Sequence, residues 1–513
     1  MSPPSPAPRE AANAACRIDN ASATGRLIWL LPVHALVWTL AARLSRGNLD
    51  IQGDMIENYA WGIEWQAGYK HPPLFAWITA AWFRVFPHSD IAYFVLSALN
   101  AMTGLLGIVA LAGCFVPRRV AVIAGVAMAV SPLYSNLAIK FNANSVLLSV
   151  WPWTAYFFVR FMQTRSRRAA IALGALAGLA VLGKYFSVVL LIALALASLA
   201  RPAWRARLAD WRALLAVAAC AAVIAPHVHW LFTNHFPTLA YADKRTGGTL
   251  LAAVARFGIY TLAQIGYLAL SFVATLMMVQ VRRGQAAQLM AQSVVRPSLN
   301  PDLWWLALGP LIVVGILALA AKTQMASVWG MAQWFAIVPL WLAVLERAGF
   351  TLRPERAVRM FAGYWLIVLV ATATVGYVGA RRNTDDAAEP RAELAAAAHA
   401  LWNERFGHGV PIAAGSTHEA RSVTFYSEGR TRHWDMFEPE TTPWLSMTDL
   451  RKQGALFVCR DGDTSCIEKS KEITGVTPVR IAVHKRSWGR DLPAHDYVLF
   501  VLAPERAPGD MRK

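Results

Sequence analysis

The sequence predicts an all-α polytopic membrane domain followed by a small C-terminal α/β domain. Of its 513 residues, 56% are hydrophobic and only 16% are charged, whereas soluble proteins average about 25% charged residues. Apolar stretches long enough to cross a ~30 Å hydrocarbon core recur between residues 27 and 380. Because these stretches are continuously apolar rather than alternating, we expect the spans to be helices.

About eleven transmembrane helices are expected. They lie near residues 27–45, 90–116, 120–138, 145–161, 169–183, 185–200, 213–232, 252–281, 303–321, 328–346 and 360–380. Basic residues gather in alternate loops, as at Arg118–Arg119 and Arg282–Arg283, so the positive-inside rule places these loops in the cytoplasm. The first large loop, residues 46–89, and the C-terminus then lie outside the cytoplasm.

Three regions follow from composition. Residues 1–26 are rich in Pro, Ala and Ser and are expected to form a disordered cytoplasmic tail, residues 27–380 the membrane domain, and residues 381–513 a soluble periplasmic α/β domain. In the last region we expect a helix at Glu393–Phe406 and strands at Pro411–Gly415, Ser422–Tyr426, Ala455–Cys459, Val479–Val483 and Tyr497–Leu502.

Two further features of the chain concern the membrane and the compartment. The apolar segment Pro72–Phe86 is too short for a crossing, so we interpret it as lying along or dipping into the membrane. Cys459 and Cys466 flank a short turn and can pair if the C-terminal region is outside the cytoplasm.

The charge excess does not indicate a nucleic-acid partner. The chain has 49 Lys and Arg against 31 Asp and Glu, a formal net charge of +18, which in a soluble protein would suggest nucleic acid. Most basic residues of the apolar part lie in short loops between spans, where membrane lipids are the expected partners.

An acidic stripe at the start of the first large loop is the first candidate for chemistry. Asp54, Glu57, Trp61 and Glu64 recur at helical spacing and would share one face of a helix. Asp54 or Glu57 could act as a general base toward an attacking hydroxyl. The alternative is an interfacial helix with a solvated polar face, which we favour for Glu64.

Cations and amides in the same and the next predicted extracytoplasmic loop could bind an anionic substrate. Lys70 and His71 precede a double proline and could contact a phosphate, although the basic pair could instead anchor the next helix at lipid headgroups. Lys140 and Asn144 could bind a lipid phosphate and orient a sugar, whereas Asn142, Asn144 or Ser145 could equally be a helix cap.

Three more cations complete the candidate set. Lys184 lies between two long apolar runs and needs an anionic partner or, alternatively, a route for its side chain to the interface. Lys244 and Arg245 lie in the fourth loop and could close over an anionic donor. No metal-binding motif is assigned, no cofactor is certain, and a divalent cation is left open. No phosphate-binding loop occurs in a supporting context, so ATP-driven transport has no local support.

Several of these motifs occur in a characteristic order. Asp54-x-x-Glu57 is followed by Trp61, by the heptapeptide GYKHPPL at 68–74 and by GKY at 183–185, with Pro226 and Trp230 further on. This order, over roughly residues 27 to 350, resembles the family 39 glycosyltransferases, which are integral membrane enzymes of the GT-C fold related to protein O-mannosyltransferases and to the aminoarabinose transferases of lipid A.

The resemblance implies a membrane enzyme with a lipid-linked donor. A sugar would pass from a polyprenyl-phosphate donor to a lipid, glycan or protein acceptor by one inverting displacement at the periplasmic face of a bacterial inner membrane, as in lipopolysaccharide modification or protein glycosylation. Asp54 would be the base with Glu57 beside it, and Lys70, His71 and Lys184 would contact the donor phosphate.

One departure from the family pattern affects the mechanism. Relatives often have an acidic residue in the second extracytoplasmic loop, where this chain has Asn142 or Asn144. The role of base then depends more heavily on Asp54. The alternative function is a polytopic secondary transporter or flippase for a lipid-linked or small anionic substrate, for which weak internal symmetry and midplane charges would be expected.

Overall fold

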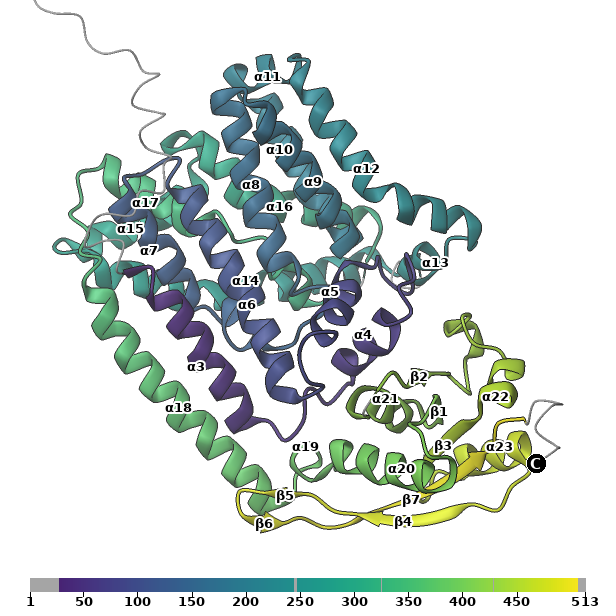
Figure 1. Ribbon diagram of the computed structural model, residues 1–513. Helices are drawn as coiled ribbons and strands as arrows, with labels where there is room; N and C mark the ends of the chain where they lie inside the picture. The colour runs from purple at the N-terminus through teal and green to yellow at the C-terminus, as the bar shows by residue number, and fades with distance from the viewer. Residues whose placement is uncertain (1–26, 244–246, 324, 428, 506–513) are drawn as a thin grey trace, which may run out of the picture. The chain divides into compact units, whose positions relative to one another are not determined.

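The computed structural model describes residues 27–243, 247–323, 325–427 and 429–505, and these form two compact units (Figure 1). We call the first the helical unit; it contains the described residues of 1–39, 70–74 and 97–368. The second, the loop–sheet unit, contains residues 40–69 and 75–96 and the described residues from 369 onward. Most of the first large loop therefore belongs to the same compact unit as the C-terminal region.

The helical unit consists of helices and short helical turns. Its α-helices, three of which continue into the other unit, are α3 (Leu30–Ser45), α6 (Asp90–Ala112), α7 (Arg118–Ala129), α8 (Leu147–Thr164), α9 (Arg167–Gly183), α10 (Val188–Ala200), α11 (Pro202–Leu208), α12 (Arg212–Thr233), α13 (Pro237–Asp243), α14 (Leu250–Met278), α15 (Arg283–Val295), α16 (Pro301–Ala320), α17 (Ile337–Arg347) and α18 (Arg356–Arg382). The 3-10 turns are η1 (Pro132–Tyr134), η2 (Leu137–Ile139), η3 (Tyr185–Ser187), η4 (Pro297–Leu299) and η5 (Ser327–Gly330).

The lengths of these helices support a membrane-embedded chain. Among the described residues, five helices are long and apolar enough to cross a bilayer, namely α6, α12, α14, α16 and α18. The number rises to seven if each of two bent pairs is one span: α7 bends by 83° into the η1–η2 segment, and the η3–α10 segment bends by 115° into α11. The expected total of eleven crossings stays a prediction.

Two expectations about this unit were wrong in detail. The expected span 328–346 is not one continuous helix. It starts with η5 and turns, and the α-helix α17 begins only at Ile337. The loop expected between residues 281 and 303 contains helix α15, whose polar sequence QAAQLMAQS gave no apolar run to indicate it.

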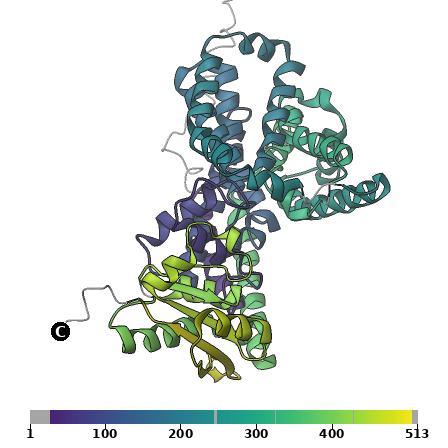
Figure 2. The ribbon, with the colours of Figure 1, turned by 90° about the vertical axis from the view of Figure 1, so that its right-hand side faces the viewer.

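Small residues allow the helices of this unit to pack closely. A Cβ atom on Gly174 of α9 would lie 2.0 Å from the carbonyl oxygen of Ala216 in α12, and one on Gly178 would lie 2.8 Å from Cβ of Val223. Only glycine fits at such a separation. Helices α9 and α12 consequently lie side by side, and α8 packs against α9, as the blue and teal ribbons of Figure 2 show.

The loop–sheet unit combines short helices with a small sheet. Its α-helices are α4 (Asp54–Gly62), α5 (Leu74–Phe83, of which Leu74 belongs to the helical unit), α19 (Asp385–Ala388), α20 (Arg391–Phe406), α21 (Thr417–Tyr426), α22 (Met447–Gln453) and α23 (Thr464–Thr474). The strands are β1 (Ile412–Gly415), β2 (Arg432–His433), β3 (Ala455–Arg460), β4 (Val479–Val483), β5 (Arg486–Ser487), β6 (Arg490–Asp491) and β7 (His495–Leu502), and η6 (Pro439–Thr441) is a 3-10 turn.

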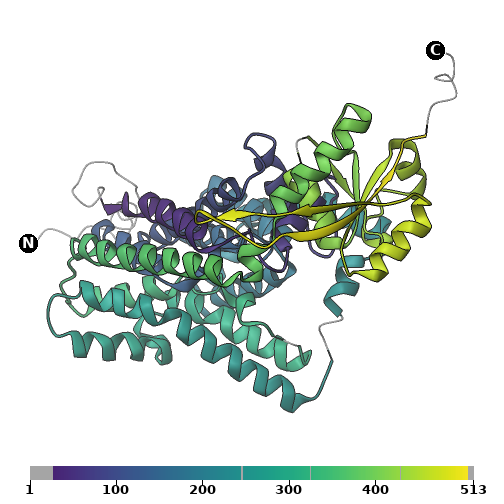
Figure 3. The same ribbon diagram turned by 90° about the horizontal axis from the view of Figure 1, so that it is seen from below.

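The main sheet has the order β2-β1-β3-β7-β4. Strands β2, β1 and β3 run parallel, and β7 is antiparallel to both β3 and β4. Leu456 and Val458 pack with α20 and α21 on one face, whereas Phe457 packs with Cys466 of α23 on the other, as alternation along a strand requires. Figure 3 shows β4 and β7 running on into the β5–β6 hairpin.

Most of the expected C-terminal elements are confirmed. The helix at Glu393–Phe406 is α20, and four of the five expected strands are β1, β3, β4 and β7. The strand expected at Ser422–Tyr426 was wrong, because these residues form the end of α21. Its buried residues Ala420, Val423 and Thr424 follow helical spacing, which five residues alone did not reveal.

Candidate functional site

The predicted site residues are divided between the two units. Asp54 and Glu57 belong to the loop–sheet unit, whereas Lys70, His71, Lys140, Asn144 and Lys184 belong to the helical unit. The predicted contacts Lys244 and Arg245 lie outside the described residues.

In the helical unit, Lys184 and Asn144 come together from segments 40 residues apart. Lys184 follows the end of α9 in an extended conformation, and its Nζ donates a hydrogen bond of 2.5 Å to Oδ1 of Asn144. The same ammonium group lies 4.8 Å from the centre of the Trp329 ring, a cation–π contact. Both of these partners, an amide and an indole ring, are neutral.

The two asparagines of the second loop have different roles. Oδ1 of Asn142 accepts hydrogen bonds from the backbone N–H groups of Asn144 (2.9 Å) and Ser145 (3.2 Å). Asn142 therefore supplies the local cap that the sequence had left as an alternative, while the side chain of Asn144 contacts Lys184. Lys140, in the same loop, is half-buried.

A second polar group in this unit was not predicted from the sequence. The hydroxyl of Tyr185, in the GKY motif, lies 2.6 Å from Nε2 of His227 and 2.8 Å from Oγ1 of Thr238. The ring of His71 meets the ring of Tyr241 edge-on, with centroids 5.2 Å apart. His71 was a predicted site residue, and Tyr185 had a sequence signal in its place beside Lys184 in the motif.

In the loop–sheet unit, helix α4 begins at Asp54 after a tight turn. Gly53 has φ +73°, and a Cβ atom there would lie 2.9 Å from Nδ1 of His418, so glycine is required for both reasons. The carboxylate of Asp50 accepts hydrogen bonds from the backbone N–H groups of Asp54 (2.9 Å) and Met55 (3.1 Å). Burial, followed by nearby arginines, lowers the pKa of His418 to about 4, so this ring is neutral at neutral pH.

The acidic stripe is paired with arginines of the C-terminal region within this unit. Glu57 lies 3.0 Å from the Arg421 guanidinium group of α21. Glu64, which lies beyond the end of α4 at Gly62, accepts two hydrogen bonds from Arg432 of β2. The expectation of a solvated polar face at Glu64 was wrong, because its side chain is 5% exposed and is held by this ion pair.

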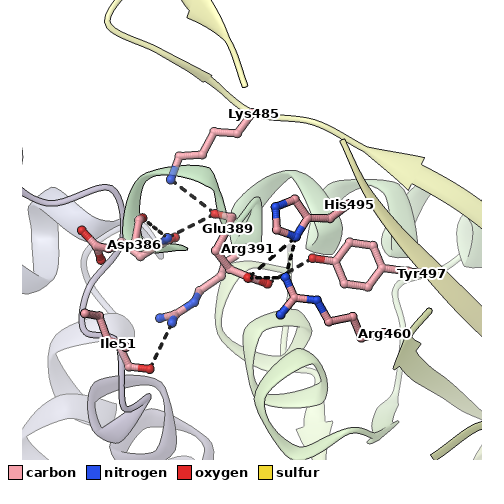
Figure 4. A network of polar contacts seen from close by, with 9 residues as sticks. Ile51, Asp386, Glu389, Arg391, Arg460, Lys485, His495 and Tyr497 are labelled. Atoms are coloured by element: carbon pink, nitrogen blue, oxygen red, sulfur yellow. Dashed lines mark hydrogen bonds and ion pairs between the residues drawn. The ribbon is translucent and has the colours of Figure 1, made fainter. Parts of the chain in front are cut away.

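A polar network connects the same turn to the C-terminal sheet (Figure 4). Arg391, the first residue of α20, donates hydrogen bonds to the backbone oxygens of Asp50 and Ile51. Glu389 contacts Arg460 of β3 and Tyr497 of β7, both at 3.1 Å. Sequence analysis missed these residues, since more than 300 residues separate them from the loop.

A cavity of about 220 Å³ opens beside α4 in the loop–sheet unit. The rings of Tyr59, Trp65 and Phe83 line it together with the guanidinium groups of Arg84 and Arg430. Arg84 lies 4.6 Å from the Trp65 ring centre. Among the described residues, neither arginine of the cavity forms an ion pair with a carboxylate, so the cavity combines aromatic surface with positive charge.

No group of three or more His, Cys, Asp or Glu side chains suited to a metal ion is found within the described parts of the chain. In the loop–sheet unit, Cys459 and Cys466 form a disulfide with Cα atoms 5.7 Å apart. The cysteine pairing that the sequence had made conditional on compartment is thus present.

Part of the helical unit matches a known protein family. Residues 70–230 match the family of dolichyl-phosphate-mannose-protein mannosyltransferases. The predicted resemblance is confirmed. The matched stretch includes Lys70, His71, Lys140, Asn144 and Lys184. A comparison with curated protein sequences finds no match.

A solved structure shares the fold of this chain. The crystal structure of ArnT from Cupriavidus metallidurans bound to undecaprenyl phosphate is 16% identical, with a TM-score of 0.51 over 93% of this chain and 98% of ArnT. The apo form of ArnT gives 17% identity, 94% and 100% coverage and a TM-score of 0.48. The mycobacterial arabinofuranosyltransferase AftD gives 15% identity, 94% and 40% coverage and a TM-score of 0.44. The match to ArnT bound to undecaprenyl phosphate establishes that the two chains share a fold.

Proposed function

We propose that this chain is an integral membrane glycosyltransferase that takes a sugar from a polyprenyl-phosphate donor. The family match over residues 70–230 is the observation on which the proposal rests, because it contains every donor-site candidate placed in the helical unit. ArnT, which has the same fold, was crystallised with undecaprenyl phosphate, a polyprenyl phosphate. The acceptor would be a lipid, a glycan or a protein.

The chemistry needs cations for the phosphate and a base for the acceptor. The ammonium group of Lys184, held by Asn144 and Trp329, is a suitable phosphate contact, with Lys70 and His71 as further candidates. As the bond between the sugar and phosphate breaks, negative charge develops on the phosphate oxygens, and a nearby cation stabilises it. No nucleotide site is required, since the donor already has its leaving group.

We assign the base to Asp54. The carboxylates near it have other tasks: Asp50 caps α4 through both oxygens, and Glu57 pairs with Arg421. Asp54 is half-buried at the first position of α4 and matches the acidic residue that begins the first loop in the family pattern. In a single displacement, Asp54 would take the proton of the acceptor hydroxyl as its oxygen attacks the anomeric carbon, with inversion.

The cavity beside α4 is our candidate for acceptor binding. Sugar rings and other flat apolar surfaces pack against aromatic side chains, and the guanidinium groups of Arg84 and Arg430 would bind a phosphate or carboxylate on the same molecule. An acceptor with an anionic group is therefore expected.

The proposed location is the inner membrane, with the region from 381 onward in the periplasm. The disulfide supports this placement, because disulfides persist in oxidising compartments. A cysteine introduced at exposed Glu404 should react with a membrane-impermeant maleimide from the periplasmic side. One at exposed Arg205 should not, and the reverse pattern would contradict the topology.

The activity can be tested by adding purified protein and a panel of polyprenyl-phosphate pentoses and hexoses to native membranes, which supply the acceptor. The expected result is consumption of one donor and release of polyprenyl phosphate. The Asp54→Asn variant should insert and fold but show no transfer. Full activity of that variant would refute the base assignment, and failure of folded protein to consume any donor would argue against glycosyl transfer. Lipid and glycan profiling of a deletion strain would identify the sugar.

A further inference from the structure

The start of helix α4 is held by a buried carboxylate rather than by an ordinary capping residue. The residue before Asp54 is Gly53, which has no side chain to cap the helix. Asp50 takes this role from four residues upstream, with Oδ2 accepting from the N–H of Asp54 and Oδ1 from that of Met55. Asp50 is 2% exposed, so these bonds are shielded from water.

Arg391 fixes the backbone that presents this carboxylate. Its Nη1 donates a 2.8 Å hydrogen bond to the carbonyl oxygen of Asp50. Its Nη2 points to the carbonyl oxygen of Ile51 at 3.5 Å (Figure 4). Arg391 is 4% exposed. A guanidinium group buried among carbonyl oxygens is strongly restricted in position, and the turn of residues 50–53 is restricted with it.

The C-terminal sheet holds the segment from which Arg391 projects. The Glu389 carboxylate contacts Arg460 of β3 and Tyr497 of β7, and its backbone oxygen accepts a 3.1 Å hydrogen bond from Asn48. The short segment 389–391 is therefore attached both to the sheet and to residues Asn48, Asp50 and Ile51, which lead into α4. All of these residues lie in one compact unit.

We propose that Asp50 and Arg391 are positioning residues for Asp54, and that the C-terminal region serves catalysis by fixing where α4 begins. This inference rests on the proposed function, in which Asp54 is the base. A general base must lie within hydrogen-bond reach of the hydroxyl it activates, and a displacement of about 1 Å can cost roughly 100-fold in rate. Asp50 and Arg391 would act on Asp54 through its backbone, without contacting the donor or the acceptor.

The test compares Asp50→Asn, Arg391→Lys and Arg391→Met in the full-length protein. The Asn side chain keeps the size of Asp50 but has one acceptor oxygen for two N–H groups. We expect Asp50→Asn to lower kcat at least tenfold, with the KM for the donor changed less than twofold. Arg391→Met should lose more turnover than Arg391→Lys, which keeps a donor for the Asp50 carbonyl. Arg480→Gln, an exposed change in β4, is the control with normal kcat.

Donor-binding stoichiometry distinguishes positioning from partial unfolding. If the variants bind one full equivalent of a polyprenyl-phosphate sugar yet turn it over slowly, the loss lies in catalysis. Reduced stoichiometry in proportion to reduced kcat would overturn the positioning role, and so would normal kcat in Asp50→Asn or in Arg391→Met. An inactive Asp54→Asn beside a normal Asp50→Asn refutes only this inference. A fully active Asp54→Asn refutes the base assignment itself.

Discussion

The guanidinium group of Arg432 binds both carboxylate oxygens of Glu64, with Nε to Oε1 at 2.8 Å and Nη2 to Oε2 at 2.7 Å. The Glu64 side chain is 5% exposed and that of Arg432 26%. Breaking a buried pair by removing one partner leaves an uncompensated charge, so Glu64→Gln should lower stability by about 3 kcal/mol. Thermal unfolding in detergent should show a clearly lower Tm.

The matched control for this prediction is the exposed pair of Arg480 and Asp461. Their side chains are 69% and 40% exposed, and exposed pairs contribute at most about 1 kcal/mol. Arg480→Gln should therefore leave Tm almost unchanged. Equal effects of Glu64→Gln and Arg480→Gln would show that the pair of Glu64 and Arg432 does not stabilise the unit.

Glu57 and Asp54 should respond differently to loss of charge. Glu57→Gln leaves the Arg421 side chain, which is 13% exposed, with Asp435 at 3.9 Å as its remaining carboxylate. We expect a stability loss of about 2 kcal/mol with transfer activity retained in the folded fraction. Asp54→Asn should do the opposite, with abolished transfer and a smaller change in Tm.

A double-mutant cycle checks the assignment of Glu57. In Glu57→Gln/Arg421→Met, neither buried charge of the pair remains, so the combined loss of stability should be smaller than the sum of the single losses. If instead Glu57→Gln abolishes transfer at an unchanged Tm, then Glu57 takes part in the chemistry.

Lys184→Ala should weaken donor binding more than it slows a saturated reaction. Charge-assisted hydrogen bonds contribute about 1.5–3 kcal/mol, so the KM for the donor should rise at least about tenfold. The control is Lys322→Ala, a change of an exposed lysine in a turn of the same unit. Unchanged donor dependence in Lys184→Ala would mean that this side chain only reaches the membrane interface.

The predictable parts of the fold have strong local patterns. Strands β3 and β7 were expected because continuous runs of apolar residues, bounded by polar residues, mark buried strands. Helix α15 was not, since its polar sequence resembles a loop. The end of α21 was assigned to a strand because Val423, Phe425 and Tyr426 favour strands over so short a window.

Sequence motifs predicted individual residues of the candidate site but not the contacts between them. Sequence order indicated Lys184 and Asn144 separately, and the fold brings them to 2.5 Å. The pairing of Glu64 with Arg432 spans 368 residues and has no local signal, since each residue alone resembles a solvated surface charge. Nothing in the spacing of Asp50 shows that it caps α4, because the capping depends on the turn at Gly53.

Glu419 should make the stability of the loop–sheet unit depend on pH. Burial, with a further contribution from Glu389, raises the pKa of Glu419 to about 7 from its usual 4.5. The folded state then binds a proton that the unfolded state has released, so this contribution is complete below pH 4.5 and is lost as pH rises to about 7. His418, whose pKa is lowered to about 4, has the opposite slope between pH 4 and 6.5.

The variant Glu419→Gln separates the two groups. Because His418 is present in both proteins, its contribution cancels in the difference between them. The Tm of Glu419→Gln relative to the parent should be higher at pH 8 than at pH 5. A constant difference across this range would show that Glu419 does not take up a proton on folding.

The disulfide between Cys459 and Cys466 should stabilise the C-terminal sheet. It joins the end of β3 to α23, and both residues are fully buried. Closing such a short loop lowers the entropy of the unfolded chain, which stabilises the folded state by about 2.5 kcal/mol. Replacing both cysteines by alanine should therefore lower Tm, while the buried Cys114, changed to alanine, serves as a control that breaks no cross-link.

Alkylation shows whether the bond forms in the cell. The chain has five cysteines, so denatured but unreduced protein should take up three alkyl groups, and reduced protein five. Burial protects the pair from reagents until the chain unfolds, so the labelling must follow rapid denaturation in acid. Protein from a strain unable to oxidise periplasmic thiols should take up five in both cases, because the bond depends on that compartment. Five groups in unreduced protein from ordinary membranes would instead place the C-terminal region in a reducing compartment and contradict the proposed topology.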